Sequence, residues 1–280
     1  MIHKNPPINS VNIINVINVI ISIIAIAFLF IFLILPLAII LIEGFNSGLS
    51  IWWDSIKNEE TLSALYLTLI VAVIVVPINL IFGVLVSWSL TKFKFKGRNL
   101  IITLIDLPFA ISPTISGLMY VLLFGIYGWF GPLLIKYNFK IIYAIPGIIL
   151  VTLFVTLPFI ARELIPLMTE QGTEEELAAI SLGANGWQTF WKITLPNIKL
   201  GLLCGIILCI ARTIGEFGAV SVVSGHIRGA TNTLPLQVEI LYNEYNFSAA
   251  FAISSLFVAV AILTLIFKHI INYEYNRKKY

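Results

Sequence analysis

Six long apolar stretches with few charged residues constrain this chain more than any other feature. An apolar stretch of about 20 residues is long enough to cross the hydrocarbon core of a bilayer as one helix. Of the 280 residues, 59% are hydrophobic and 11% are charged, against roughly 45–50% and about 25% in soluble domains. We therefore expect an all-α integral membrane protein, with residues 1–280 forming a single transmembrane domain. The six stretches lie near residues 17–42, 61–90, 100–124, 142–164, 198–224 and 247–270.

Basic residues between the stretches are unevenly distributed, and this predicts the orientation. Twelve fall on one side: Lys4, Lys92, Lys94, Lys96, Arg98, Arg162, Lys192, Lys199, Lys268, Arg277, Lys278 and Lys279. The opposite side holds Lys57, Lys136, Lys140 and Arg228, and Arg212 lies within the fifth stretch. Because cytoplasmic loops carry the excess of Lys and Arg, both termini and the 162–199 region are expected in the cytoplasm.

Residues 165–197 form a long loop with helical signals of its own. Thr173 precedes Glu176 at the spacing of a capping box, and Gly183 suits a left-handed helix C-cap. A second short amphipathic helix is expected from Trp187, with Trp187, Phe190, Trp191 and Leu195 towards one side. Pro196 fits the first turn of the next span. Such a pair of helices suits a groove on a partner protein, or equally an interfacial hairpin on lipid headgroups.

The spacing within this loop resembles the cytoplasmic loop of ABC importer permeases. Ala178, Ala179, Gly183, Ile193, Leu195 and Pro196 match the pattern Ala-Ala, three residues, Gly, nine residues, Ile-x-Leu-Pro. Leu177 stands where that motif usually has Glu, and Glu176 is displaced by one position. The resemblance implies a type I importer permease fold with a two-helix coupling loop that contacts a separate ATPase. The implied coupling residues are Glu176, Leu177, Ala178, Ala179, Gly183, Ala184, Trp187, Ile193, Leu195 and Pro196.

Longer segments resemble the W-type membrane subunit of sulfate/thiosulfate importers. They are residues 162–168, 182–188, 215–225, 231–237 and 242–246. Molybdate and tungstate permeases share the Gly-Glu-Phe-Gly-Ala run at 215–219, so such a permease is the alternative. Ala230 departs from the acidic residue expected in the sulfate subfamily. The resemblance implies a T-type second permease subunit, two ABC ATPases and an external sulfate-binding protein. It also implies a bacterial inner membrane, or the plastid inner envelope if the chain is organelle-encoded.

The candidate translocation path centres on two opposite charges in the fifth stretch. Arg212 and Glu216 lie four residues apart and would face the same side of a helix. A charge within a membrane span indicates function by default, here positive potential for a dianion, but a structural ion pair is the alternative. Ser221 and Ser224 are further path candidates. His226 and Arg228, in a glycine-rich outer turn, could meet an anion or the binding protein, or form an ordinary solvated turn.

Other function classes lack their sequence requirements. The chain contains no G-x-x-x-x-G-K-[ST] loop and no H-E-x-x-H motif, so we expect a permease subunit and not an enzyme. His3, His226 and His269 are too scattered for a metal site, and Cys204 and Cys209 suit packing. A stand-alone channel would leave the 165–197 loop unexplained. We therefore expect no cofactor and no nucleic-acid partner.

Overall fold

The computed structural model describes residues 8–279, with side chains described from Ile17 to Ile271 and at Tyr273. Helices form nearly all of this part of the chain, and it contains no strand. The α-helices are α1 (Ile8–Leu29), α2 (Leu35–Asn46), α3 (Leu49–Lys57), α4 (Glu59–Lys92), α5 (Arg98–Ala110), α6 (Pro113–Phe124), α7 (Gly131–Lys136), α8 (Ile145–Thr156), α9 (Pro158–Gln171), α10 (Glu174–Ser181), α11 (Gly186–Thr189), α12 (Leu195–Ile214), α13 (Gly218–Ser224), α14 (Leu234–Asn243) and α15 (Phe247–Lys279). Two π-helical turns, η1 (Phe30–Ile34) and η2 (Phe190–Thr194), join neighbouring helices.

Five continuous helical stretches of the described chain are long and apolar enough to cross a membrane, and a bent pair supplies a sixth. The prediction of an all-α membrane protein is therefore confirmed, and the six predicted spans are matched when the bent pair is counted as one span. The five are Ile17–Asn46, Glu59–Lys92, Ile145–Gln171, Gly186–Ile214 and Phe247–Ile271, and the pair is α5 with α6.

The span expected at 100–124 is broken. Helices α5 and α6 meet at 104°, because Ile111 and Ser112 both adopt extended backbone conformations. Pro113 follows them at the start of α6, and a residue before proline is pushed out of the helical region. Hydropathy alone does not register such a break.

The span expected at 198–224 is broken as well, and it begins earlier than expected. A continuous helical stretch runs from Gly186 to Ile214, and a separate helix α13 starts at Gly218. In the same way, the fourth span runs on to Gln171. The 165–197 loop is consequently shorter than its sequence suggests.

Packing around α4 forms much of the core. Four clusters of buried apolar residues join it to α8, α9, α12, α13 and the α14–α15 region. Asn79 in α4 donates a 2.7 Å hydrogen bond to the Thr156 hydroxyl of α8, inside the bundle. Helices α6 and α13 approach so closely that a Cβ on Gly117 would lie 2.6 Å from the Ala219 carbonyl oxygen. Only glycine fits there.

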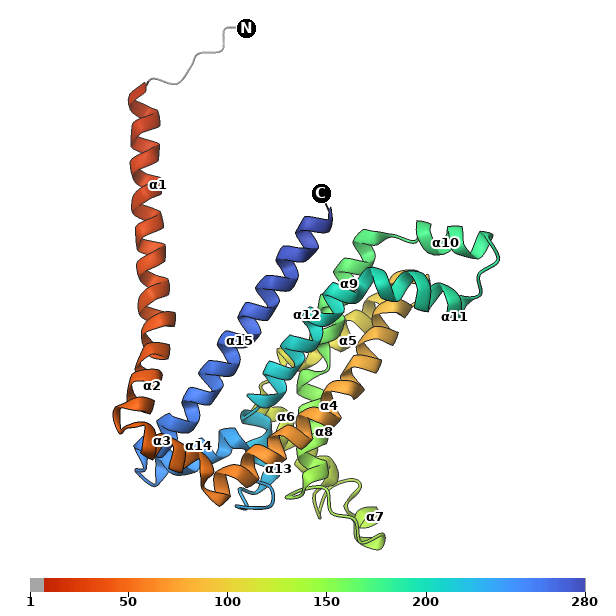
Figure 1. The fold of residues 1–280 in the computed structure, drawn as a ribbon. Helices are drawn as coiled ribbons and strands as arrows, with labels where there is room; N and C mark the ends of the chain where they lie inside the picture. The colour runs from red at the N-terminus through yellow and green to blue at the C-terminus, as the bar shows by residue number, and fades with distance from the viewer. Residues whose placement is uncertain (1–7, 280) are drawn as a thin grey trace.

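The two ends of the bundle differ in what they carry. The start of α1, the C-terminal end of α15 and the α10–α11 region lie at one end, and α3, α7 and α14 lie at the other (Figure 1). Helix α1 stands apart from the bundle (Figure 1), and the most apolar window of its span contains no buried residue. Only α2, at the end of this span, packs against α15. The first span is therefore open to lipid or to a second subunit.

Candidate coupling and translocation sites

A compact two-helix unit, which we call the knob (Gly172–Thr194), projects at the end of the molecule that carries the start of α1 and the end of α15 (Figure 1). Its first helix, α10, ends at the predicted glycine: Gly183 has φ +91°. The amide of Gly183 donates to the Ile180 carbonyl at 2.9 Å, and the amide of Ala184 donates to the Ala179 carbonyl at 3.0 Å. These two bonds form a Schellman motif, so the predicted left-handed cap is confirmed.

The predicted capping box at the start of α10 is wrong. The Thr173 side chain makes no capping hydrogen bond. The Glu176 carboxylate instead lies 2.6 Å from Lys92 Nζ at the end of α4, and it accepts a 3.2 Å hydrogen bond from the Thr194 hydroxyl. Because Lys92 and Glu176 are only 7% and 13% exposed, an ion pair between them outweighs a solvated cap.

The second half of the knob begins with a capping box that the sequence analysis did not identify. Asn185 accepts from the Gln188 amide at 2.8 Å, and Gln188 accepts from the Asn185 amide at 3.0 Å. The sequence predicted a separate short helix here, but the helix that follows continues through η2 into α12. Since Pro196 cannot donate and its ring crowds the preceding turn, the chain widens there, and the Leu195 amide bonds the Phe190 carbonyl.

The aromatic residues of the second knob helix lie together, as predicted, since the Phe190 ring contacts both Trp187 and Trp191, with centroids 6.3 and 5.7 Å apart, but they differ in exposure. Phe190 packs against Trp88 of α4, with ring centroids 5.2 Å apart, and Leu195 joins the same cluster. Trp187 and Trp191 remain exposed and contact each other edge to face. The exposed apolar residues of the knob form what we call the knob patch: Leu177, Ile180, Leu182, Trp187 and Trp191.

The remaining predicted coupling residues differ in exposure. Ala178, Gly183 and Pro196 are exposed, Ala184 and Ile193 are half-buried, and Ala179 is buried. Leu177 faces solvent at the position where the motif has Glu, whereas Glu176 turns inward. The knob therefore presents an apolar surface at that position and no carboxylate from Glu176.

Arg212 and Glu216 form the predicted ion pair, although a helix end separates them. An Arg212 guanidinium nitrogen lies 2.7 Å from a Glu216 carboxylate oxygen. The second carboxylate oxygen accepts a 3.0 Å hydrogen bond from the Ala219 amide in the first turn of α13. The Arg212 side chain is 31% exposed and that of Glu216 is 1% exposed. Only Arg212 is accessible from outside this subunit.

The two serine candidates lie in different environments. Ser221 is half-buried, and its hydroxyl donates to the Gly218 carbonyl within α13. Ser224 is fully buried. Its hydroxyl accepts from the His226 amide at 3.1 Å, and its carbonyl accepts from the Thr231 hydroxyl at 2.6 Å. Ser224 therefore helps to hold the 224–231 turn together.

The turn at residues 225–229 places His226 and Arg228 among carboxylates. His226 Nδ1 lies 3.9 Å from Glu239. Arg228 bonds both carboxylate oxygens of Glu60, at 3.1 and 3.0 Å, and it also pairs with Glu244. The bond with Glu60 raises the pKa of Arg228 above its usual value, so this side chain stays charged. Neither carboxylate partner was identified from sequence, because Glu60 lies 168 residues and Glu244 16 residues from Arg228, beyond the reach of a helical spacing.

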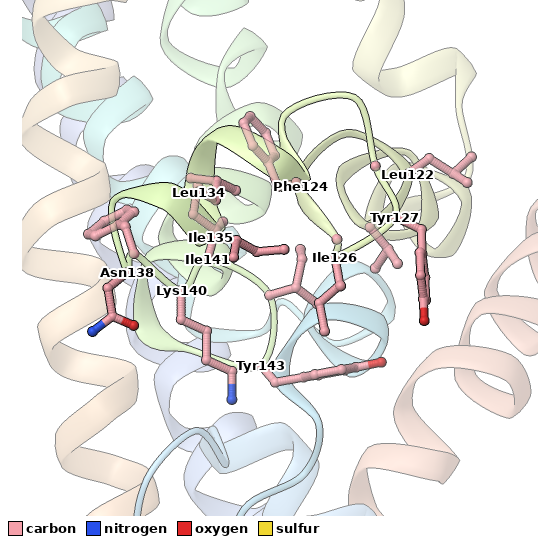
Figure 2. Close-up of a pocket in the computed structure, with 16 residues that line it drawn as sticks. Leu122, Phe124, Ile126, Tyr127, Leu134, Ile135, Asn138, Lys140, Ile141 and Tyr143 are labelled. Atoms are coloured by element: carbon pink, nitrogen blue, oxygen red, sulfur yellow. The ribbon is translucent and has the colours of Figure 1, made fainter.

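A cavity of about 550 Å³ lies in the connection between α6 and α8, and its lining is mostly apolar. Leu134, Ile135 and Ile141 line it together with Tyr143 and Lys140 (Figure 2). The Tyr143 amide donates to the Val223 carbonyl at 2.8 Å, which attaches this connection to α13. None of the candidate path residues lines the cavity. Across the described residues, no three His, Cys, Asp or Glu side chains are grouped to hold a metal ion.

Comparison with known proteins agrees with these features. Residues 80–274 match the family described as "Binding-protein-dependent transport system inner membrane component". The chain is 46% identical over 247 residues to the sulfate transport system permease protein CysW of Escherichia coli K12, covering 88% of this chain and 85% of that protein. It is 34% identical over 254 residues to CysT of the same organism, covering 91% and 92%.

A solved structure has the same fold. A chain of a bacterial alginate ABC transporter superposes with a TM-score of 0.76 at 16% identity, covering 90% of this chain and 92% of that chain. At such low identity the likeness speaks for the fold alone. The match over residues 80–274 and the 46% identity to CysW together show the family of this chain. This chain belongs to the family of binding-protein-dependent transport system inner membrane components, as a CysW-like ABC importer permease.

Proposed function

We propose that this chain is a membrane-spanning permease subunit of an ATP-driven importer of sulfate or thiosulfate. The observation that carries the proposal is the 46% identity to a sulfate transport system permease along nearly the whole chain. The molybdate or tungstate alternative shares the 215–219 run, but the similarity to the sulfate permease extends far beyond that run. ATP hydrolysis belongs to a separate subunit.

The same comparison supports the proposed partners. Escherichia coli K12 has both a CysW and a CysT protein, each named a sulfate transport system permease, and this chain is closer to CysW. We propose a T-type permease as its second membrane subunit, with two ABC ATPases and an external sulfate-binding protein. The exposed α1 offers a surface for such a subunit as well as for lipid.

The knob patch is the proposed contact with the ATPase. Its side chains are apolar and aromatic and lie on a unit held rigid by the Schellman motif, the Asn185 capping box and the Lys92 ion pair. A rigid apolar surface matches a partner groove better than it matches water. Movement of the knob would reach α9 and α12 directly, since both helices continue from it.

For the path, we propose that Arg212 supplies positive potential to a crossing dianion. It is the accessible member of the Arg212–Glu216 pair, whereas the carboxylate is buried behind it. Because Glu216 neutralises part of that charge, the anion would be attracted without being held tightly. Ser221 lies nearby on α13 as a secondary candidate, and His226 and Arg228 belong to the outer surface that would face the binding protein.

The orientation is also a proposal. The knob, the start of α1 and the end of α15 lie at one end of the molecule (Figure 1), and the basic residues predict that this end is cytoplasmic. Lys4, one of those basic residues, lies outside the described residues. The proposed location is the bacterial inner membrane; for an organelle-encoded chain it would be the plastid inner envelope.

A labelling experiment tests this orientation. In a background with Cys204→Ser and Cys209→Ser, Ser181→Cys on the knob should react with a membrane-impermeant thiol reagent only from the cytoplasmic side. Asn243→Cys at the opposite end should react only from outside, because both positions are exposed. Labelling of intact cells and of inverted vesicles measures this directly. Reaction of the knob position in intact cells would reverse the proposed orientation.

A further inference from the structure

Lys92, at the end of α4, binds the knob at the start of α10. Its ammonium group lies 2.6 Å from Glu176 on α10, and it also bonds the carbonyl of Gly172 in the turn before α10. Thr194, in the turn that leads out of the knob, donates to the same Glu176 carboxylate. One side chain at the last residue of α4 therefore contacts the knob near its entry and, through Glu176, near its exit.

The Lys92–Glu176 contact is largely shielded from solvent, unlike the ion pair between α9 and α5. The Lys92 and Glu176 side chains are 7% and 13% exposed, whereas the Arg162–Asp106 pair between α9 and α5 is about half exposed. A buried pair with additional hydrogen bonds keeps its geometry, because separating it leaves an uncompensated charge. The knob and the end of α4 should therefore move together.

Helix α4 leads from the knob to the opposite end of the molecule. It is continuous for 34 residues, past Pro77, and thus about 50 Å long. It packs against α8, α9 and α12, and Asn79 bonds Thr156 near its middle. Pro77 interrupts the backbone hydrogen bonding of α4, but Val75, Val76 and Asn79 beside it are buried in the bundle, so we expect packing to support the helix there.

The outer end of α4 is bonded to the loop that follows α13. Glu60 receives both hydrogen bonds from one Arg228 nitrogen, and Gln237 of α14 donates to Glu60 at 3.5 Å. Further along α4, the Thr68 hydroxyl accepts from the Leu234 amide at 2.9 Å. The segment from Arg228 to Leu234 and the start of α14 thus rest on α4.

We propose that α4 is a rigid connection between the knob and the outer 225–234 segment, and that Lys92 is the positioning residue at which it takes up movement of the knob. This inference rests on the proposed coupling to an ATPase. It adds a mechanical route through a helix that is not joined to the knob in sequence. Helices α9 and α12 follow the knob because they are covalently joined to it. Helix α4 is not joined to the knob in sequence; Lys92 is its charged contact with the knob, beside the packing of Trp88 on Phe190 and of α4 on α9 and α12.

The test uses the complete transporter in proteoliposomes: this chain, the T-type subunit, the ATPase and the sulfate-binding protein. Lys92→Met removes the charge and keeps a long apolar stem, and Lys92→Arg keeps the charge. Lys94→Met is the matched control, because Lys94 lies exposed in the same segment. The readouts are ATPase retained on purification and labelled sulfate imported per ATP hydrolysed.

We expect Lys92→Met to retain the ATPase but to import roughly tenfold less sulfate per ATP. Lys92→Arg should restore most of that ratio, and Lys94→Met should match the unaltered complex. An unchanged ratio in Lys92→Met would overturn the inference, and so would loss of the ATPase from this variant, because Lys92 would then only shape the docking surface. If the unaltered complex imports no sulfate, the proposed function fails instead.

A second variant tests the same connection from its outer end. Glu60→Gln removes the charge that binds Arg228 at a partly exposed site, so little effect on folding is expected. It should retain the ATPase and lower sulfate import per ATP about as Lys92→Met does. If Lys92→Met does not accumulate, this variant decides alone: an import ratio equal to that of the unaltered complex would contradict a connection through α4.

Discussion

Arg212→Ala is expected to destabilise the folded subunit by about 3–5 kcal/mol, the usual cost of breaking a buried ion pair from one side. Glu216 is 1% exposed, so its carboxylate would lose its counter-charge without gaining access to water. The amount of folded subunit and its thermal stability in detergent measure this loss. Glu216→Gln should be milder, since its amide oxygen can still accept from Ala219 and the remaining Arg212 is partly exposed.

The double variant Arg212→Ala with Glu216→Gln separates the structural role from the path role. It removes both charges and keeps the acceptor for Ala219, so folded protein should recover towards its original level. If Arg212 supplies potential along the path, labelled sulfate uptake per folded complex should stay low despite that recovery. Uptake close to that of the unaltered complex would eliminate the path role and leave a structural ion pair.

Gly183→Val is expected to abolish or strongly reduce association with the ATPase while membrane insertion stays normal. At φ +91° a β-branched residue is strained by roughly 1–3 kcal/mol, and relief of that strain would undo the Schellman motif. Crowding does not contribute, because a Cβ added at Gly183 would meet no other atom within 4 Å. Co-purification of the ATPase with the variant measures the effect.

Gly186→Val is the matched control for that variant. Gly186 lies three residues further along the same knob, is exposed, has open space around it and does not require a positive φ. It should bind the ATPase normally. Equal ATPase binding and sulfate uptake by Gly183→Val and the unaltered chain would show that the turn at Gly183 is not part of the coupling contact.

The sequence was sufficient to predict the spans, because membrane crossing depends on length and apolarity alone. It was not sufficient to predict where the spans break. Pro113 after Ser112 is a readable signal of the first break, since proline restricts the residue before it. The second break, between Ile214 and Gly218, has no comparable signal. There Glu216 lies beyond the end of α12, and its carboxylate accepts a hydrogen bond from the Ala219 amide in the first turn of α13.

Local and long-range interactions explain the different outcomes within the knob. Gly183 was predicted correctly because its conformation follows from the backbone itself. The capping box at Thr173 was predicted wrongly because Glu176 binds Lys92, which belongs to a helix far away in sequence, and burial makes that bond the stronger one. A pattern within four residues cannot reveal such a competitor.

Charged residues of the candidate path show the same division. The Arg212–Glu216 contact could be predicted, since a spacing of four residues brings the side chains together even where the helix ends. The attachment of Arg228 to Glu60 and Glu244 could not, because it depends on how the outer loop rests on α4 and α14. That arrangement follows from packing of the whole bundle.

The central claim is that this chain forms the membrane path of an ATP-driven sulfate importer, and one transport measurement tests it most directly. Proteoliposomes would contain this chain with a T-type permease, the ABC ATPase and external sulfate-binding protein, and labelled sulfate uptake would be followed with and without ATP. We predict uptake that requires ATP, the binding protein and this chain together. Unlabelled thiosulfate should compete and lower the uptake of labelled sulfate. Uptake without ATP, uptake that persists when this chain is omitted, or activity only with a molybdate-binding protein would contradict the account.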